Sequence, residues 1–322
     1  MLIEVKNLKK YFPIKGSKEV VKAVDEVSFG IEKGKTFGLV GESGCGKSTT
    51  ARTIIRLHEA TSGSVVFDSF DTSKMTKSSY REFSKNIQMV FQDPYASLNP
   101  RMTVERTLMD PLNIHKIGTK QERQDRVKEL LELVGLDLRY LKRYPHEFSG
   151  GQRQRIGIAR ALALNPQFVI LDEAVSALDV SIQSQILNLL MDLQQKLKLT
   201  YLFISHDLSV IEYMCDNIGI MYLGKIVESG DRNQIFNNPS HPYTKALLSA
   251  IPEINPDKRR EQIILKGDLP SITSLKQGCA FYSRCNASKV ECEVNSQDLQ
   301  MINDGHFVAC QVMVDDIKAR RT

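Results

Sequence analysis

A glycine-rich segment at residues 41–48 reads GESGCGKS and fits the spacing G-x-x-x-x-G-K-S. Glycines at these positions let backbone N–H groups turn inward at the start of a helix, where they can bind phosphate oxygens. Lys47 would then reach the β- and γ-phosphates, and the Ser48 hydroxyl would bind Mg²⁺. A purely structural glycine turn is the alternative. The residues predicted to surround the phosphates are Gly41, Ser43, Gly44, Cys45, Gly46, Lys47, Ser48 and Thr49.

Two adjacent acids follow a short apolar run further along the chain. The run FVILD at 168–172 predicts a buried strand that ends at Asp172 and is followed by Glu173. Asp172 would hold Mg²⁺, directly or through water, and Glu173 would act as general base on the attacking water or orient it. Alone, this pattern mostly marks a strand that enters a solvated loop. Placed after a phosphate loop, it predicts a nucleotide hydrolase.

Residues 148–152 read FSGGQ and predict a second place for an anion. Ser149 is a good N-cap, and the paired glycines after it leave backbone N–H groups bare at the start of a helix. An ordinary helix cap would have the same residues. The group predicted to contact a nucleotide here is Ser149, Gly150, Gly151 and Gln152.

These three patterns together resemble the ABC ATPase family, whose signature sequence is similar to FSGGQ followed by RQRIGIARA. The resemblance implies a Q-loop glutamine at Gln92 that also binds Mg²⁺, a D-loop that ends at Asp179, and a switch histidine at His206. Alone, Gln92 or His206 would be an ordinary polar residue at a strand end. Tyr11 stands where the family places an aromatic ring that stacks on adenine, although the adjacent Phe12 makes simple packing the alternative. The resemblance also implies that two such domains meet head to tail, with each ATP between one chain's loop and the other's signature.

Two further stretches resemble the ATPase subunits of bacterial oligopeptide and dipeptide importers, namely FQDPYASLNPRM at 91–102 and HPYTKAL at 241–247. The run GGQRQR at 150–155 resembles the F-type more than the D-type subunit of such importers. The resemblance implies a D-type ATPase partner, two transmembrane permease subunits and, indirectly, an extracellular substrate-binding protein, with ATP and Mg²⁺ as cofactors. A nickel or metal-chelate importer shares these sequences. A soluble ABC protein of DNA repair or translation is a further alternative, but its usual coiled-coil insert or tandem cassettes are not seen.

Four of the six cysteines crowd toward the end of the chain, at Cys279, Cys285, Cys292 and Cys310. A cytosolic compartment keeps thiols reduced, so metal ligation is the alternative to free thiols. Four sulfur ligands suit either Zn²⁺ or an iron–sulfur cluster. The pattern C-x₅-C-x₆-C-x₁₇-C resembles the C-terminal segment of peptide-importer ATPases, which favours a four-iron, four-sulfur cluster. Asn286 departs from that family pattern, in which a proline is common, and Cys45 and Cys215 are predicted to fill space.

Periodicity predicts the elements that position these residues, in an α/β fold of the P-loop type with helices on a largely parallel sheet. A strand ends at the phosphate loop and a helix without breakers follows it, as phosphate binding requires. An insert at about 93–164 is predicted to be mostly helical. The strands are predicted at 2–6, 20–29, 36–40, 64–67, 87–91, 168–172 and 199–205, and the helices at 47–57, 181–197 and 208–215.

Composition, net charge and hydropathy of the whole chain indicate its domain division and its place in the cell. Prolines and a charged run predict a boundary near 251, which separates an ATPase domain at 1–250 from a C-terminal extension at 251–322. The net charge of +5 is spread along the chain and does not by itself indicate a nucleic-acid partner. No signal peptide is recognisable, and no apolar stretch approaches the roughly 20 residues that span a bilayer. We therefore expect a peripheral subunit on the cytoplasmic side of a membrane.

Overall fold

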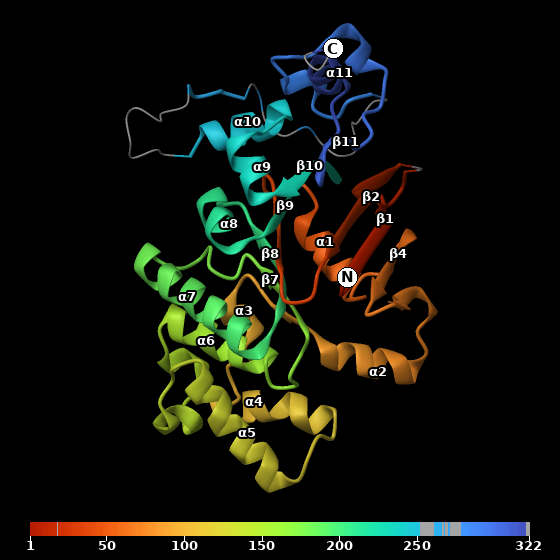
Figure 1. Ribbon diagram of the computed structural model, residues 1–322. Helices are drawn as coiled ribbons and strands as arrows, with labels where there is room; N and C mark the ends of the chain where they lie inside the picture. The colour runs from red at the N-terminus through yellow and green to blue at the C-terminus, as the bar shows by residue number, and fades with distance from the viewer. Residues whose placement is uncertain (18, 252–260, 266, 268–269, 271–277, 320–322) are drawn as a thin grey trace. The chain divides into compact units, whose positions relative to one another are not determined.

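The computed structural model describes residues 1–17, 19–251, 261–265, 267, 270 and 278–319 (Figure 1). The chain divides into two compact units, which are described in turn. The first unit comprises Met1–Ile3, Ile31–Thr36 and Phe67–Ser205, and the second comprises Glu4–Gly30, Phe37–Val66 and His206–Thr322.

Three parallel strands form the sheet of the first unit. The strand β7 (Phe168–Asp172) lies between β6 (Ile87–Val90) and β8 (Thr200–Ser205) and pairs in parallel with both. Every residue of β7 and β8 is buried, as expected for continuous apolar strands of a parallel sheet covered on both faces. Asp172 ends β7 and pairs with Ile204, so the acid stands at the carboxyl edge of this sheet.

Helices make up most of the remaining first unit. The helices α4, α5 and α6 pack against one another (Figure 1). The helix α2 was not predicted, because Phe83 is its one buried side chain and it therefore has little apolar periodicity. The elements are β5 (Phe70–Asp71), η1 (Thr72–Lys74), α2 (Lys77–Asn86), α3 (Pro94–Ser97), α4 (Val104–Ile114), α5 (Lys120–Leu133), η2 (Leu138–Lys142), η3 (Pro145–Glu147), α6 (Gly150–Ala161) and α7 (Val180–Leu197).

The larger sheet of the second unit includes strands from the C-terminal extension. The strand β9 (Asn217–Tyr222) pairs in parallel with β3 (Thr36–Val40) and antiparallel with β10 (Lys225–Asp231). On the far side of β10, β12 (His306–Val308) pairs antiparallel and is followed by β11 (Gln300–Asn303). These described residues beyond the predicted boundary thus belong to the same compact unit as the phosphate loop.

The other elements of the second unit include a smaller sheet in which β1 lies between β2 and β4. Two predicted bounds were wrong by three residues or more. The first strand continues to Pro13, and the helix after the phosphate loop ends at Ile54 because Arg56 turns into the left-handed region at φ 60°. The elements are β1 (Ile3–Pro13), β2 (Val20–Ile31), α1 (Lys47–Ile54), β4 (Ser62–Phe67), α8 (Leu208–Met214), α9 (Arg232–Asn237), α10 (Pro242–Ser249), η6 (Tyr282–Arg284), η7 (Val290–Glu293) and α11 (Gln311–Ala319).

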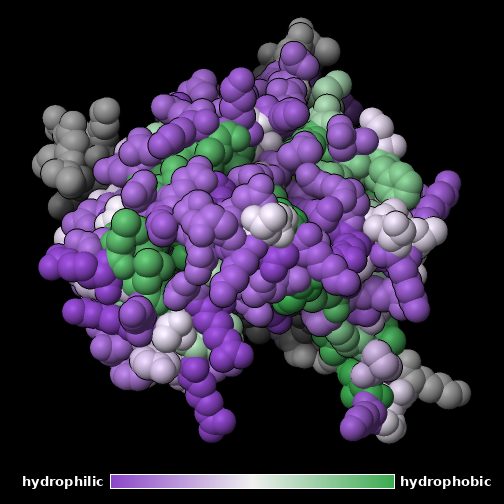
Figure 2. All heavy atoms as spheres, turned by 90° about the horizontal axis from the view of Figure 1, so that it is seen from below, coloured by the Kyte–Doolittle hydropathy of each residue, from purple (hydrophilic) through white to green (hydrophobic). Residues whose placement is uncertain are grey.

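The surface in Figure 2 is largely hydrophilic, with hydrophobic side chains gathered in small separate patches. Such patches are ordinary on folded proteins, because polar groups do not cover a whole surface. Among the described residues, no helix has both the length and the apolar character needed to cross a membrane.

Candidate nucleotide site

The phosphate loop, residues 41–48, joins β3 to α1 and bends at two glycines. Gly41 and Gly46 have φ angles of 156° and 111°. A Cβ atom at Gly41 would lie 2.1 Å from the carbonyl oxygen of Met221, and one at Gly46 would lie 2.1 Å from that of Ala23. Only glycine fits at both positions, because neighbouring backbone fixes the course of the loop. Gly44 instead faces open space.

Lys47 lies inside this loop. Its side chain is buried, and Nζ donates hydrogen bonds to the carbonyl oxygens of Gly41 at 2.8 Å and Glu42 at 2.9 Å. A buried ammonium needs such partners, since an unpaired buried charge is costly. Ser43 and Gly44 in the middle of the loop are exposed. The loop therefore holds a positive charge beside an open glycine-rich turn, an arrangement suited to a phosphate group.

Cys45 is the fully buried residue of the same loop. Burial raises the pKa of its thiol, and the nearby Lys47 ammonium offsets this only in part. The thiol therefore stays protonated and packs, so Cys45 offers a nucleotide its backbone alone. Cys215 is also buried, and a Cβ atom at Gly38 would lie 2.8 Å from its Sγ. Both arrangements agree with the predicted space-filling roles.

The acid strand brings two predicted catalytic residues together. Gln92 Nε2 donates a hydrogen bond to Glu173 Oε2 at 2.6 Å. Glu173 has φ 47°, which is uncommon for a residue other than glycine, and its N–H donates to the Ile204 carbonyl at 3.0 Å. Backbone held in such a region is frequent at functional sites. Asp172 is 1% exposed, whereas Glu173 is half-buried and open to water.

The signature residues form the start of α6. Ser149 Oγ accepts the Gln152 N–H at 3.3 Å, and the Ser149 N–H donates to Gln152 Oε1 at 3.1 Å, which is a capping box. Ser149 and Gly150 are exposed. Gly151 is buried, and a Cβ atom there would lie 2.4 Å from Ile182 Cγ2 of α7. The first glycine thus leaves the helix start open to solvent, and the second lets α6 and α7 approach closely.

Three further predicted residues differ in their exposure and contacts. Asp179 is exposed at the N-cap of α7, where its side chain makes no capping hydrogen bond. His206 is exposed and directly follows β8. Tyr11 of β1 donates its hydroxyl hydrogen bond to Asp25 Oδ1 at 2.5 Å, and Lys22 Nζ lies 5.8 Å from its ring centroid. Stacking of the half-buried Tyr11 ring on adenine stays a prediction.

The predicted nucleotide residues are divided between the two units. The second unit holds the phosphate loop, Thr49, Tyr11 and His206. The residues predicted to bind phosphate therefore belong to the second unit, and those predicted to bind Mg²⁺ and activate water belong mainly to the first. The residues of the first unit are Gln92, Ser149, Gly150, Gly151, Gln152, Asp172, Glu173 and Asp179.

The four C-terminal cysteines lie near one another in the second unit. The Cys279 N–H donates to the Cys292 carbonyl at 2.8 Å. The pKa of Cys279 is raised to about 11, mainly by burial and to a smaller extent by the other three thiols. Within the described residues, no group of three or more His, Cys, Asp or Glu side chains could hold a metal ion. The four cysteines are free thiols, and their described arrangement supports neither the predicted cluster nor zinc.

One contact of the phosphate loop falls outside every predicted pattern. Arg284 pairs with Glu42 although the two residues are 242 positions apart in the chain. Local spacing carries no signal of such a pair. Tyr243, which also contacts Glu42, lies in the HPYTKAL stretch that was noted only for its resemblance to importer subunits.

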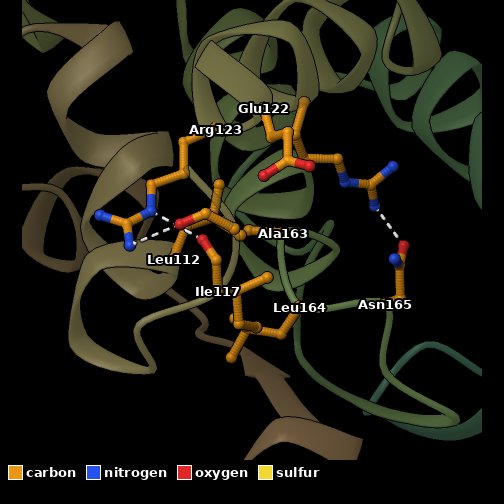
Figure 3. A pocket seen from close by; sticks show the side chains of 9 residues that line it. Leu112, Ile117, Glu122, Arg123, Ala163, Leu164 and Asn165 are labelled. Atoms are coloured by element: carbon orange, nitrogen blue, oxygen red, sulfur yellow. Dashed lines mark hydrogen bonds between the residues drawn. The ribbon is translucent and has the colours of Figure 1, made fainter. Parts of the chain in front are cut away.

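A cavity of about 180 Å³ lies among the helices of the first unit (Figure 3). Arg123 at its rim donates to the carbonyl oxygens of Ile117 at 2.7 Å and Gly118 at 3.0 Å, and Arg126 donates to Asn165. These arginines hold the backbone and side chains of the wall, and no residue predicted to bind nucleotide lines the cavity. Its lining consists of Leu112, Ile117, Gly118, Glu122, Arg123, Arg126, Ala163, Leu164 and Asn165.

The strand, glycine loop and helix, together with the acid-ended strand and the capped glycine helix, define a P-loop nucleotide-binding cassette. Comparison with known families identifies two of them along the chain. Residues 24–176 match the family described as ABC transporter, and residues 227–292 match the family described as "Oligopeptide/dipeptide transporter, C-terminal region".

Relatives and solved structures agree with these matches. The chain is 51% identical over 319 residues to the oligopeptide transport ATP-binding protein AppF of Bacillus subtilis (strain 168), covering 97% of each chain. It is 52% identical over 311 residues to OppF of the same organism, covering 96% of each. A dimeric structure of the ATP-binding cassette MJ0796 with ADP and phosphate has TM-score 0.65 and 29% identity, and covers 71% of this chain and 98% of that one. The cbiO1 structure from Clostridium perfringens has TM-score 0.65 and 25% identity, and covers 74% of this chain and 91% of that one.

The chain therefore belongs to the ABC transporter family, in the group of oligopeptide transport ATP-binding proteins. Its reaction is ATP hydrolysis coupled to transport.

Proposed function

We propose that this chain is the F-type ATP-binding subunit of an importer for oligopeptides or dipeptides, attached to the cytoplasmic side of the membrane. The observation that carries the proposal is the identity of about one half to oligopeptide transport ATP-binding proteins over nearly the whole chain. That similarity covers 96–97% of this chain and so includes most of the extension, whereas the match to MJ0796 covers 71% of this chain. No observation favours the nickel or metal-chelate alternative.

We propose the following role for each predicted residue. Lys47 would bind the β- and γ-phosphates, and Ser48, Asp172 and Gln92 would hold Mg²⁺, which neutralises the charge that develops on the phosphates. Glu173 would accept a proton from the attacking water or orient it, while its 2.6 Å hydrogen bond from Gln92 fixes the carboxylate. His206 would contact the phosphate that is transferred, and Tyr11 would stack on the adenine.

The exposed signature supports a site shared between chains. Ser149 and Gly150 present the N-terminus of a twelve-residue helix to solvent, where it can bind the phosphates of a second chain's ATP. Asp179, exposed at the start of α7, would contact the same partner. A D-type ATPase subunit is the proposed partner, and two permease subunits would carry the motion across the membrane.

Reconstitution tests the substrate and the partners together. The chain, a D-type subunit and two permeases from the same operon would be placed in proteoliposomes with the extracellular binding protein. We expect ATP-dependent uptake of a labelled oligopeptide or dipeptide that stops when either ATPase subunit is omitted. Uptake of a nickel chelate in place of peptide would contradict the substrate, and full activity without the D-type subunit would contradict the proposed partner.

For the four cysteines we propose a four-iron, four-sulfur cluster in the native protein. The support is the number of thiols and their spacing in the sequence, C-x₅-C-x₆-C-x₁₇-C. In their described places no three of them could hold a metal ion, so cluster binding would require the thiols to move closer together. Anaerobic purification should give a brown protein with about four iron and four sulfide per chain. Replacing Cys285 with Ser should bleach it. Colourless anaerobic protein without iron would leave free thiols, as the described arrangement has them.

A further inference from the structure

Glu42, the second residue of the phosphate loop, is held by two side chains from distant parts of the second unit. Nη1 of Arg284 lies 3.0 Å from each oxygen of the Glu42 carboxylate. The backbone N–H of Glu42 donates to the Tyr243 hydroxyl at 3.1 Å. The Arg284 side chain is 8% exposed and that of Glu42 is 26% exposed. The pair is thus largely shielded from water, and charges shielded in this way interact more strongly than charges at the surface.

An aromatic cluster places Arg284 beside the loop. Phe281 of the extension packs against Tyr222 and Tyr243, with ring centroids 5.2 Å and 5.4 Å apart. The Arg284 guanidinium lies 6.0 Å from the Tyr222 ring centroid. Among the described residues, its Nε atom is buried without a hydrogen-bond partner. The guanidinium thus lies between the Glu42 carboxylate, with which it forms an ion pair, and Tyr222, whose hydroxyl also interacts with it. The cluster limits where the guanidinium can move.

Hydrogen bonds at the start of α10 hold Tyr243 in place. His241 is buried, and burial lowers its pKa to about 4, so its ring is neutral at physiological pH. Its Nδ1 can then accept the Tyr243 N–H at 3.1 Å as a helix cap. The Glu228 carboxylate accepts the His241 N–H at 2.9 Å and contacts His306 Nε2 of the extension at 2.8 Å. The HPYT stretch thereby ties α10, β10 and β12 together behind the loop.

The charge of Glu42 is unfavourable for the loop's function unless it is paired. ATP brings several negative charges to backbone N–H groups and Lys47, and an unpaired carboxylate on the loop's second residue would repel them. We propose that Arg284 is a positioning residue for nucleotide binding: it neutralises Glu42 and holds it back, so that the C-terminal extension completes the phosphate site. A brace that only ties the extension to the cassette is the competing account.

Charge neutralisation predicts an order of ATP affinities that a brace does not. In the full-length chain, Arg284→Ala should weaken ATP binding by about tenfold, since a charged hydrogen-bonded pair is lost and a bare carboxylate remains. Glu42→Gln should bind ATP at least as tightly as the parent. The double variant R284A/E42Q should recover most of the lost affinity, because the repelling charge is gone. Under the brace account, both single variants lose affinity or neither does.

Equilibrium titration with a fluorescent ATP analogue measures these affinities, and thermal unfolding without nucleotide reports whether each variant is folded. Lys289→Ala is the matched control, because Lys289 is an exposed cation of the same extension and should leave affinity unchanged. Unchanged affinity in R284A, or no recovery in the double variant, overturns the proposal. If R284A does not fold, E42Q decides alone: weaker ATP binding than in the parent overturns the proposal, and equal or tighter binding supports it.

Discussion

The phosphate loop and the signature helix start both present backbone N–H groups to an anion, but they are built differently. The loop is enclosed by its own unit: Gly41 and Gly46 lie against backbone carbonyls, and Lys47 is buried. At the signature, Ser149 and Gly150 are exposed, and local capping satisfies the helix start. The loop is thus complete within one chain, whereas the signature is open to a group from outside. Binding of ATP should therefore depend on this chain alone, and turnover on a partner.

The sharpest separation of binding from turnover is expected at Glu173. Glu173→Gln keeps a hydrogen-bonding side chain beside Gln92 but removes the basic oxygen, so hydrolysis in the assembled complex should fall by about 100- to 10,000-fold. ATP affinity should stay near that of the parent, because the phosphate loop is unchanged. Steady-state ATPase rates and nucleotide titration measure the two quantities. Glu132→Gln, an exposed acid on α5, is the control, and near-normal turnover in E173Q would remove Glu173 from the catalytic role.

Replacing Lys47 should change ATP affinity, whereas replacing Glu173 should change turnover. Lys47→Ala removes the cation that the loop holds with the Gly41 and Glu42 carbonyl oxygens, and hydrogen bonds to charged groups contribute about 1.5–3 kcal/mol. We expect ATP affinity of the isolated chain to fall by about tenfold or more. Arg52→Ala removes an exposed cation from the same helix and should bind ATP as the parent does. Equal affinities in the two variants would contradict the assignment of Lys47.

The sequence predicted this comparison only in outline. The motif at 41–48 and the motif at 149–152 are each local in the chain, so the phosphate loop and the capped helix could be predicted from the sequence. The hydrogen bond from Gln92 to Glu173 joins positions 81 apart, and periodicity encodes neither this contact nor the left-handed backbone of Glu173. The strands β11 and β12 were missed because they have four and three residues, too few for an alternating pattern to emerge.

An effect confined to the partner's site is expected at Ser149. Ser149→Arg places a bulky side chain at the exposed helix start, so it should block closure over the ATP held by the partner's loop. Own-loop affinity for ATP should not change, because the substitution leaves the phosphate loop and its Lys47 hydrogen bonds intact. Hydrolysis by complexes in which the partner carries the only intact catalytic glutamate isolates that site. Ser184→Arg on α7 is an exposed control, and equal activity in both variants would argue against a shared site.

The smallest expected effect tests whether the signature's second glycine serves packing. A Cβ atom at Gly151 would lie 2.4 Å from Ile182 Cγ2, so Gly151→Ala should force α6 and α7 apart and reduce the free energy of unfolding by about 1–3 kcal/mol. Gly157 lies on the same helix, and a Cβ atom there would meet nothing within 4 Å, so Gly157→Ala should instead gain up to about 1 kcal/mol from helix propensity. Urea unfolding of both variants measures the difference. If both alanines are stabilising, α7 does not require a glycine at 151, and the residue must be explained by contact with nucleotide alone.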